Sequence, residues 1–193
     1  CLENSHRFVG GQANVQMVTR KTPNDVLAAG TILACQLWRK GENCQVIVPV
    51  KSGTIGTHKT NLLLQDRLNP TGAPVADGIR VGDRVIVTKN CYDREAPAYN
   101  GQTGKVLESD EDGWIWVKLE TGTALPFRRN ELDLAYALTV LRAQGSQWDG
   151  VVCLIPGEAY QEFLDERLMY TATTRGRVST IVIREAGGEA RCS

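Results

Sequence analysis

Two apolar segments that flank a polar turn set the fold class of this chain. Residues 134–138 (LAYAL) and 151–155 (VVCLI) are continuous apolar runs, as expected for strands that are buried on both faces of a parallel sheet. Between them lies the polar turn 139–149 (TVLRAQGSQWD). Polar residues where such a strand leaves the sheet are well placed to meet a ligand. The same spacing also fits an ordinary connection between core elements, so the turn alone does not decide the function.

A second polar segment with its own apolar strand follows soon after this turn. Residues 168–177 (LMYTATTRGR) lead into the apolar run 179–183 (STIVI). In this order the two segments resemble motifs V (T-V-H-K/R-A/S-Q-G-S) and VI (Y-T-A-x-T-R-A/G) of superfamily 1 helicases. The joint match is far more specific than either motif alone. It resembles in particular the RecD-like DNA helicases, the family of the exonuclease V alpha subunit.

The beginning of the chain extends this resemblance. Residues 2–8 (LENSHRF) resemble motif IV of the family, an L-x-x-x-x-R-F/Q pattern. In that family the arginine of this motif, here Arg7, reaches the terminal phosphate of ATP. The resemblance then covers nearly the whole chain, from Glu3 to Ile183.

One segment comes close to a phosphate-binding loop. Residues 53–60 (GTIGTHKT) fit the pattern G-x-x-x-x-G-K-[ST] except that His58 replaces the second glycine. A side chain at this position obstructs the wrapping of the backbone around phosphate oxygens, and no later strand ends in an acidic pair for magnesium. The family offers another account, because RecD-like proteins carry a strand ending in proline, here Pro49, then G-x-x-G and a helix. We therefore expect that this chain alone does not hydrolyse ATP.

The pattern changes to short strands in the middle of the chain. After a linker with Pro and Gly at residues 71–78, segments such as 81–87 and 114–119 alternate or are rich in strand-forming residues, and Asn100-Gly101 signals a tight turn. These features predict a small antiparallel β-barrel over residues 76–130. It resembles the barrel that RecD-like helicases insert before motif V.

Local signals also predict core elements. A helix is expected to begin at Thr22-Pro23, with proline at its first position, and to end at Gly41. Trp114 and Trp116 are expected to fill the core of the barrel, because a tryptophan buries a large apolar area.

These observations predict an α/β fold: the RecA-like parallel sheet of a second helicase motor domain with an inserted small antiparallel β-barrel. The expected sections are the first part of the motor domain, the barrel, the second part with motifs V and VI, and a tail, at residues 1–75, 76–130, 131–184 and 185–193.

The composition limits the possible partners. The formal net charge of the 193 residues is zero, so any nucleic-acid contact must come from local basic groups. Six cysteines form no C-x-x-C pair, and only two histidines accompany them, so no metal site is expected. Cysteines without a disulfide pattern fit a reduced, cytoplasmic setting. No apolar run reaches membrane-spanning length, and we expect no signal peptide. The chain opens on Cys1, and we expect it to be part of a longer protein.

The resemblance implies roles for individual residues. The longer protein would be an ATP-dependent helicase that moves 5′ to 3′ on single-stranded DNA. ATP and Mg²⁺ would be bound mainly by a first motor domain that precedes this one. Arg175 would act as an arginine finger, with Arg7 assisting, while Gly145 and Gln147 would line the nucleotide. The motif residues expected on the DNA side are Thr139, Arg142 and Ser146.

Loop residues of the predicted barrel are further candidates. Tyr92 or Tyr99 could stack on a base, and Arg128 and Arg129 could contact a phosphate. An ordinary loop aromatic and a pair of solvated arginines explain the same residues.

Several alternatives remain open at this point. Family members usually have His where Leu141 stands and often Glu where Gln147 stands, and Leu141 mildly favours a non-catalytic nucleic-acid-binding module. A nucleotide-binding protein that uses residues 53–60 is a third possibility. Arg175 could instead be a helix-end residue that bonds the last carbonyls. The expected partners are single-stranded DNA and the first motor domain, and the resemblance leaves open whether the longer protein works alone or with other exonuclease subunits.

Overall fold

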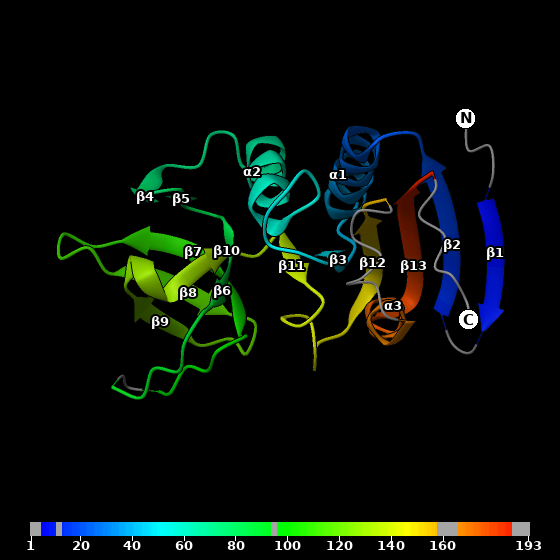
Figure 1. Ribbon diagram of the computed structural model, residues 1–193. Coiled ribbons are helices and arrows are strands. Elements are labelled where there is room, and N and C mark those ends of the chain that lie inside the picture. The colour runs from blue at the N-terminus through cyan, green and yellow to red at the C-terminus, as the bar shows by residue number, and fades with distance from the viewer. Residues whose placement is uncertain (1–4, 11–12, 94–95, 158–165, 187–193) are drawn as a thin grey trace. The chain divides into compact units, whose positions relative to one another are not determined.

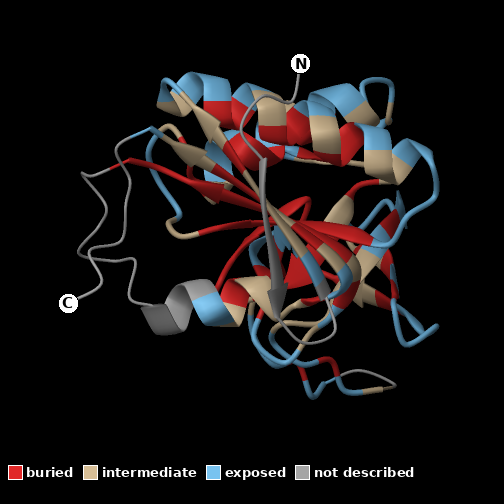
Figure 2. Cartoon of the chain, turned by 90° about the vertical axis from the view of Figure 1, so that its right-hand side faces the viewer, coloured by how far each residue is buried: buried red, intermediate tan, exposed pale blue. Residues whose placement is uncertain are grey.

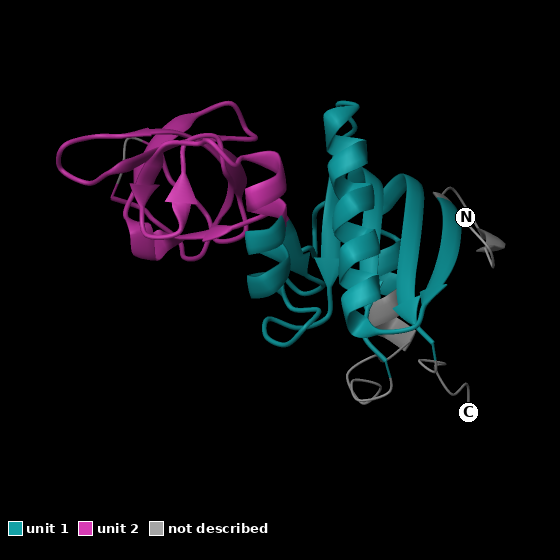
Figure 3. Cartoon of the chain, turned by 90° about the horizontal axis from the view of Figure 1, so that it is seen from above, with its two compact units in different colours: residues 1–63, 137–193 teal, residues 64–136 magenta. Residues whose placement is uncertain are grey.

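A computed structural model describes most of the chain, and the described residues are 5–10, 13–93, 96–157 and 166–186. Side chains are described from residue 14 onward within these ranges, except for residues 166–169. The chain forms two units, one of residues 1–63 with 137–193 and the other of residues 64–136 (Figure 3). Each unit is described by itself below.

The first unit is built on a six-stranded sheet (Figure 1). All neighbouring strands pair in parallel except the outermost β1, which runs antiparallel to β2. The order across the sheet is β1 (Ser5–Gly10), β2 (Ala13–Arg20), β13 (Gly176–Glu185), β12 (Trp148–Ile155), β3 (Cys44–Val48) and β11 (Ala137–Thr139). This confirms the predicted α/β fold with a parallel sheet.

Helix α1 (Pro23–Arg39) covers one face of this sheet, and α3 (Glu166–Thr173) lies on the other (Figures 1 and 2). The predicted start of α1 is confirmed: Thr22 and Asp25 form a reciprocal capping box. In the middle of α1, a Cβ on Gly30 would overlap the side chain of Leu154, so glycine permits the close approach of helix and sheet. Strand β3 is buried along its whole length and β12 at every residue except Asp149, as the apolar run 151–155 predicted for β12.

Helix α2 (Thr57–Leu68) begins in the first unit. There its Asn61 side chain donates a hydrogen bond to the Ala137 carbonyl and accepts one from the Ala137 N–H, at 3.1 and 2.7 Å. Since β11 is an edge strand, the amide of Asn61 satisfies backbone groups of Ala137 that no neighbouring strand reaches. The side chain therefore acts as a clamp on the first residue of β11.

The second unit contains the predicted antiparallel insertion, which the structure confirms as a five-stranded sheet. A short hairpin of β4 (Pro74–Ala76) and β5 (Ile79–Arg80) precedes it, and a 3-10 turn, η1 (Arg129–Glu131), comes before its last strand. The order across the sheet is β10 (Leu132–Leu134), β6 (Arg84–Val87), β7 (Thr103–Ser109), β8 (Ile115–Leu119) and β9 (Ala124–Phe127).

A buried carboxylate joins the two ends of the second unit. Asp83 is fully buried and accepts hydrogen bonds from the side chains of Gln65, Asn69 and Tyr136 and from the N–H of Arg80. Burial and the neighbouring Asp83 charge raise the pKa of the Tyr136 hydroxyl, which keeps it a donor. Residues near the entry to the insertion and at its exit therefore share one polar network.

Two expectations about this region were wrong in detail. Trp114 and Trp116 are only partly buried, and the core consists of Phe127 with aliphatic residues. Trp114 instead lies beneath the guanidinium of Arg128, which is 3.6 Å from the centre of its ring. The apolar run 134–138 is not one strand either, because Leu134 ends β10 and Ala137 begins β11. An apolar run shows that residues are buried and does not show to which sheet they belong.

Within the described residues, no helix combines the length and apolar character needed to cross a membrane.

Candidate functional site

The turn with the motif V pattern connects opposite ends of the parallel sheet. Strands β11 and β12 both run parallel to β3, one on each side of it. Thr139, at the end of β11, is level with Val48 at the end of β3, whereas Gly150 of β12 is level with Cys44 at the start of β3. Residues 140–147 therefore run from the carboxyl end of the sheet back to its amino end. This one turn can contact ligands at both ends.

At the carboxyl end, the turn begins with Thr139 and Arg142. The hydroxyl of Thr139 accepts a hydrogen bond from the Arg142 N–H at 3.3 Å, and its carbonyl accepts one from the N–H of Ala143 at 3.0 Å. These bonds fix the first bend of the turn. Arg142 is half-buried there, and Leu141 beside it is 68% exposed.

The loop after β3, which resembles a phosphate loop, is closed by its own backbone. The N–H groups of Thr57 and His58 donate to the carbonyls of Val50 and Lys51, at 3.1 and 3.2 Å. A Cβ on Gly56 would lie 2.6 Å from the Lys51 carbonyl oxygen. The glycine therefore serves a tight turn, and N–H groups that would cradle a phosphate in a working loop are already engaged.

At the amino end, the motif V turn meets the motif VI arginine. Arg175 follows α3; its Nε donates to the Thr171 carbonyl at 3.1 Å and its NH1 to the Ser146 carbonyl at 3.5 Å. The Arg175 carbonyl in turn accepts from the N–H of Trp148 at 3.0 Å. The structure thus brings Arg175 together with the segment Gly145–Gln147, in which Gly145 adopts a φ of +84°.

The connection from α3 to β13 fixes the backbone of Arg175. A Cβ on Gly176 would overlap the hydroxyl of Thr180, and that hydroxyl donates to the Thr173 carbonyl at 3.0 Å. An ion pair of 2.9 Å between Arg177 and Asp149 links the starts of β13 and β12. Arg175 remains half-buried, with part of its surface open to solvent.

Arg7 is placed only by its backbone. It lies in β1 and pairs with Gln16 of β2, and its side chain lies outside the described residues. Strands β2 and β13 separate β1 from β12 in the sheet order.

The candidate arginines of the insertion are engaged within it. Besides stacking on Trp114, Arg128 donates to the carbonyl of Asp112 at 2.7 Å, in a loop that also carries Asp110 and Glu111. Arg129 donates to the carbonyls of Asp77 and Leu132.

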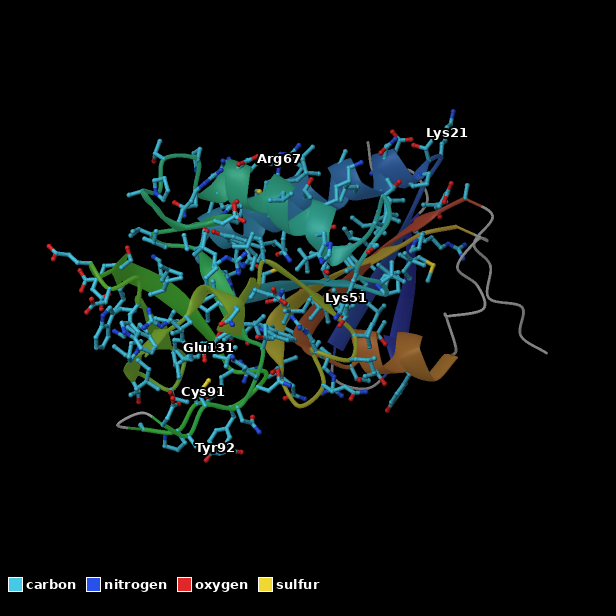
Figure 4. All side chains as sticks on the ribbon, turned by 60° about the vertical axis from the view of Figure 1, so that its left-hand side comes forward. Lys21, Lys51, Arg67, Cys91, Tyr92 and Glu131 are labelled. Atoms are coloured by element: carbon cyan, nitrogen blue, oxygen red, sulfur yellow. The ribbon has the colours of Figure 1, made fainter. Side chains whose placement is uncertain are left out.

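Tyr92, by contrast, is 69% exposed, and Figure 4 shows it at the outer edge of the second unit, beyond Cys91 and Glu131. It lies in the segment that connects β6 to β7. The side-chain amide of Asn90 donates a hydrogen bond to the Tyr92 hydroxyl, and the sequence analysis did not single out Asn90 as a site residue. A polar loop residue carries no sequence signal that would distinguish it from a solvated asparagine.

The described residues show neither a metal cluster nor a reactive thiol. No group of three or more His, Cys, Asp or Glu side chains in the described ranges could hold a metal ion. Cys35, Cys44, Cys91 and Cys153 are all buried, and burial with the neighbouring Cys44 raises the pKa of Cys153 to about 12, so this thiol packs as a small apolar group.

A known protein family matches the part of the chain that carries both motifs of this site. Residues 134–183, which include the motif V turn, α3 and most of β13, match the UvrD-like helicase C-terminal domain.

Two curated relatives extend the similarity to about 70% of the chain. The ATP-dependent RecD2 DNA helicase of Deinococcus radiodurans is 42% identical over 143 residues, which cover 69% of this chain and 19% of that protein. The RecBCD enzyme subunit RecD of Mycolicibacterium smegmatis is 34% identical over 141 residues, covering 72% of this chain and 24% of that protein. The chain therefore spans about a fifth to a quarter of the length of these relatives.

Solved structures support the fold. A structure on DNA unwinding at forked double-stranded DNA by two coordinating Pif1 helicases gives a TM-score of 0.52 at 19% identity, covering 84% of this chain and 47% of that one. Bacteroides Pif1 bound to single-stranded DNA gives 0.51 at 18% identity, with coverages of 84% and 50%. The Pif1 structures support the fold alone, whereas the domain match and the two RecD relatives show that the chain belongs to the RecD-like family of superfamily 1 helicases and carries their UvrD-like C-terminal domain.

Proposed function

We propose that this chain acts as the second motor domain of an ATP-dependent DNA helicase that moves 5′ to 3′ on single-stranded DNA. The observation that carries the proposal is the path of the motif V turn from Thr139 to Gln147. It joins one end of the sheet, where Arg142 lies, to the other end, where Arg175 lies. A shift of the turn where it meets DNA, near Arg142, would therefore move the segment that contacts Arg175, and the reverse.

On the nucleotide side, Arg175 is the proposed arginine finger. Its planar guanidinium would neutralise the charge that develops on the transferred phosphoryl group of ATP. The hydrogen bonds to the carbonyls of Thr171 and Ser146 use two of the five N–H donors of Arg175. They orient the guanidinium and leave its other three N–H groups to donate to a phosphate. Gly145 and Gln147 would line the edge of the nucleotide, and Arg7 would assist Arg175.

A first motor domain would bind most of ATP and its Mg²⁺. The closed loop at residues 53–60 supports this division, because the N–H groups of Thr57 and His58 already donate to backbone carbonyls. Mg²⁺ would neutralise phosphate charge, while Arg175 would add the positive charge needed as the bond to the transferred group breaks.

On the DNA side, Arg142 would contact the phosphates of single-stranded DNA, and the buried Thr139, whose hydroxyl accepts from the Arg142 N–H, would hold Arg142 in place for that contact. Ser146, whose carbonyl accepts from Arg175, would pass changes at the DNA to the nucleotide. In the insertion, Tyr92 would contact a base. Because Arg128 and Arg129 already bond within the insertion, we propose that they stabilise it and are not primary phosphate contacts.

The first motor domain is the first proposed protein partner. The name of the mycolicibacterial relative, a RecBCD enzyme subunit, supports other exonuclease subunits as further partners. A non-catalytic nucleic-acid-binding module is the second candidate function, favoured by the exposed Leu141 at the position of the family's histidine.

The salt dependence of DNA binding tests the DNA side of the proposal. The chain should bind single-stranded DNA weakly, with an affinity that falls as salt rises, because phosphate contacts release counterions. Arg142→Ala should weaken binding and reduce the slope of log K against log salt by about one. Arg175→Ala should leave this slope unchanged. Equal slopes for the wild type and Arg142→Ala in anisotropy titrations would remove Arg142 from the DNA contact.

A further inference from the structure

The rings of two exposed tyrosines meet in the insertion. The segments 90–92 and 98–100, here called the tyrosine hairpin, are joined by two backbone hydrogen bonds between Cys91 and Ala98, of 2.8 and 2.9 Å. Tyr92 on one segment is 69% exposed and Tyr99 on the other is 48% exposed. Cys91 between these exposed neighbours is buried, which anchors the hairpin to the core.

Both rings are held in place although they face solvent. The side-chain amide of Asn90 donates to the Tyr92 hydroxyl at 3.0 Å, while its oxygen accepts from the Asn100 N–H at 2.8 Å. The two rings meet edge to face, with centres 6.3 Å apart and planes at 78°. The backbone of Tyr99 is fixed by a hydrogen bond of 2.8 Å to Gln102. Ordering an exposed side chain costs entropy, so a fixed exposed ring favours a binding role over a solvated one.

The surroundings favour a nucleic-acid base over a protein surface. Among the described residues of the insertion, Leu107 is the only other exposed large apolar side chain, and Asn90, Asp93 and Asn100 beside the two tyrosines are exposed polar residues. Two tyrosines supply at most about 500 Å² of contact, against about 800 Å² on each side of a standard protein interface. A base needs only one ring face, and amides such as those of Asn90 and Gln102 suit its polar edge.

We propose that Tyr92 and Tyr99 form a stacking platform for an unpaired base of single-stranded DNA, with Asn90 as the residue that positions Tyr92. This inference rests on the proposed DNA-binding function and deepens it, because it adds a base contact that tolerates any sequence to phosphate contacts at Arg142.

The experiment compares two labelled oligonucleotides of equal length and charge. One is oligo-dT and the other has abasic sites throughout its centre, so only the first can stack. Anisotropy titrations at low salt would use the full 193-residue chain, with Leu107→Ala as the matched control for the loss of an exposed apolar side chain in the same unit. Melting temperatures of all variants would be measured in parallel.

Tyr92→Ala should weaken binding to oligo-dT about five- to a hundredfold, because stacking of one base on an aromatic ring has this value. It should leave binding to the abasic strand unchanged, and Tyr92→Phe should recover most of the lost affinity. Asn90→Ala should show a smaller loss, again only with oligo-dT.

Three results would overturn the platform. One is unchanged affinity of Tyr92→Ala for oligo-dT, another is an equal loss for both oligonucleotides, and the third is a loss matched by Leu107→Ala. If Arg142→Ala still lowers the salt slope in these cases, the platform fails while the proposed DNA contact of the domain stands. A chain that binds neither strand at low salt contradicts both.

Discussion

Asp83 shows how much one residue can contribute to the second unit. It is fully buried and accepts four hydrogen bonds, from groups spread between Gln65 and Tyr136. Sequence patterns did not predict this role, because an Asp between Gly82 and Arg84 looks like an ordinary turn residue. Its partners lie up to 53 positions away in the sequence, and only folding brings them together.

Asp83→Ala should strongly destabilise the protein. The mutation leaves several donors buried without their acceptor, and the expected loss is about 3 kcal/mol or more in the free energy of unfolding. Asp66→Ala is the matched control, because Asp66 is an exposed carboxylate paired with Arg80 and should cost less than about 1 kcal/mol. Urea titration measures both, and equal losses would contradict the role of the Asp83 network.

Tyr136 should make stability depend on alkaline pH. Its pKa is raised in the folded protein above the ordinary value of 10.0, so its contribution is complete below pH 10 and is lost as pH rises through the folded value. One such group changes the free energy of unfolding by at most about 1.4 kcal/mol per pH unit. Cys153 acts in the same direction above its ordinary value of 9.0.

Tyr136→Phe should therefore reduce the loss of stability above pH 10, while costing about 1 kcal/mol near neutral pH for the lost hydrogen bond. Urea unfolding at a series of pH values would measure this, with exposed Tyr92→Phe as the control. An identical pH profile for the wild type and Tyr136→Phe would refute the assignment.

At the scale of elements, α2 uses one polar face to fix other segments. Asn61 and Gln65 of α2 and Asn69, directly after its last residue, are spaced by four residues, and the Asn69 N–H still donates to the Gln65 carbonyl, so all three share this face. Asn61 bonds to both backbone groups of Ala137, and the other two bond to Asp83. The helix therefore organises its surroundings through amides as well as through apolar contacts.

Asn61→Ala should cost about 2–3 kcal/mol, because the buried N–H and carbonyl of Ala137 lose their partner. Leu62→Ala, at the next position, should stay within about 0.5 kcal/mol, since Leu62 is 53% exposed. Denaturant titrations of the two variants provide the comparison. If Asn61→Ala is as stable as Leu62→Ala, the amide does not hold β11.

Elements differ in how far the sequence predicted them. The start of α1 was predicted correctly because Thr22, Pro23 and Asp25 are local signals that act within one turn. The division of residues 134–138 between two sheets was not, because strand pairing depends on partners distant in sequence. The two tryptophans were misplaced for a related reason, since their volume suited a core but Phe127 occupies it.

At the scale of the whole chain, motif order was the most informative signal. The V and VI patterns predicted both the parallel sheet and the family, and the structure places Ser146 against Arg175 as two motifs of one site would require. The contacts of Arg128 and Arg129 could not be predicted, because a basic pair carries no information about nearby carbonyls. The roles of the site residues toward ATP and DNA are still proposals.

The rate of ATP hydrolysis in Arg175 variants tests the central claim most directly. The measurement would use the longer protein that joins this domain to a first motor domain, and would compare kcat, KM for ATP and melting temperature. Arg177→Ala is the matched control, because it removes an arginine two positions away whose described partner is Asp149, in an exposed ion pair.

Arg175→Ala should lower kcat on the order of a thousandfold, with a much smaller change in KM and an unchanged melting temperature, because an arginine finger acts on the transition state. Arg175→Lys should recover little, since lysine keeps the charge but loses the planar fork. A fall in melting temperature, with turnover reduced only in proportion to the folded fraction, would instead make Arg175 a structural residue that bonds the carbonyls of Thr171 and Ser146, and would contradict the account.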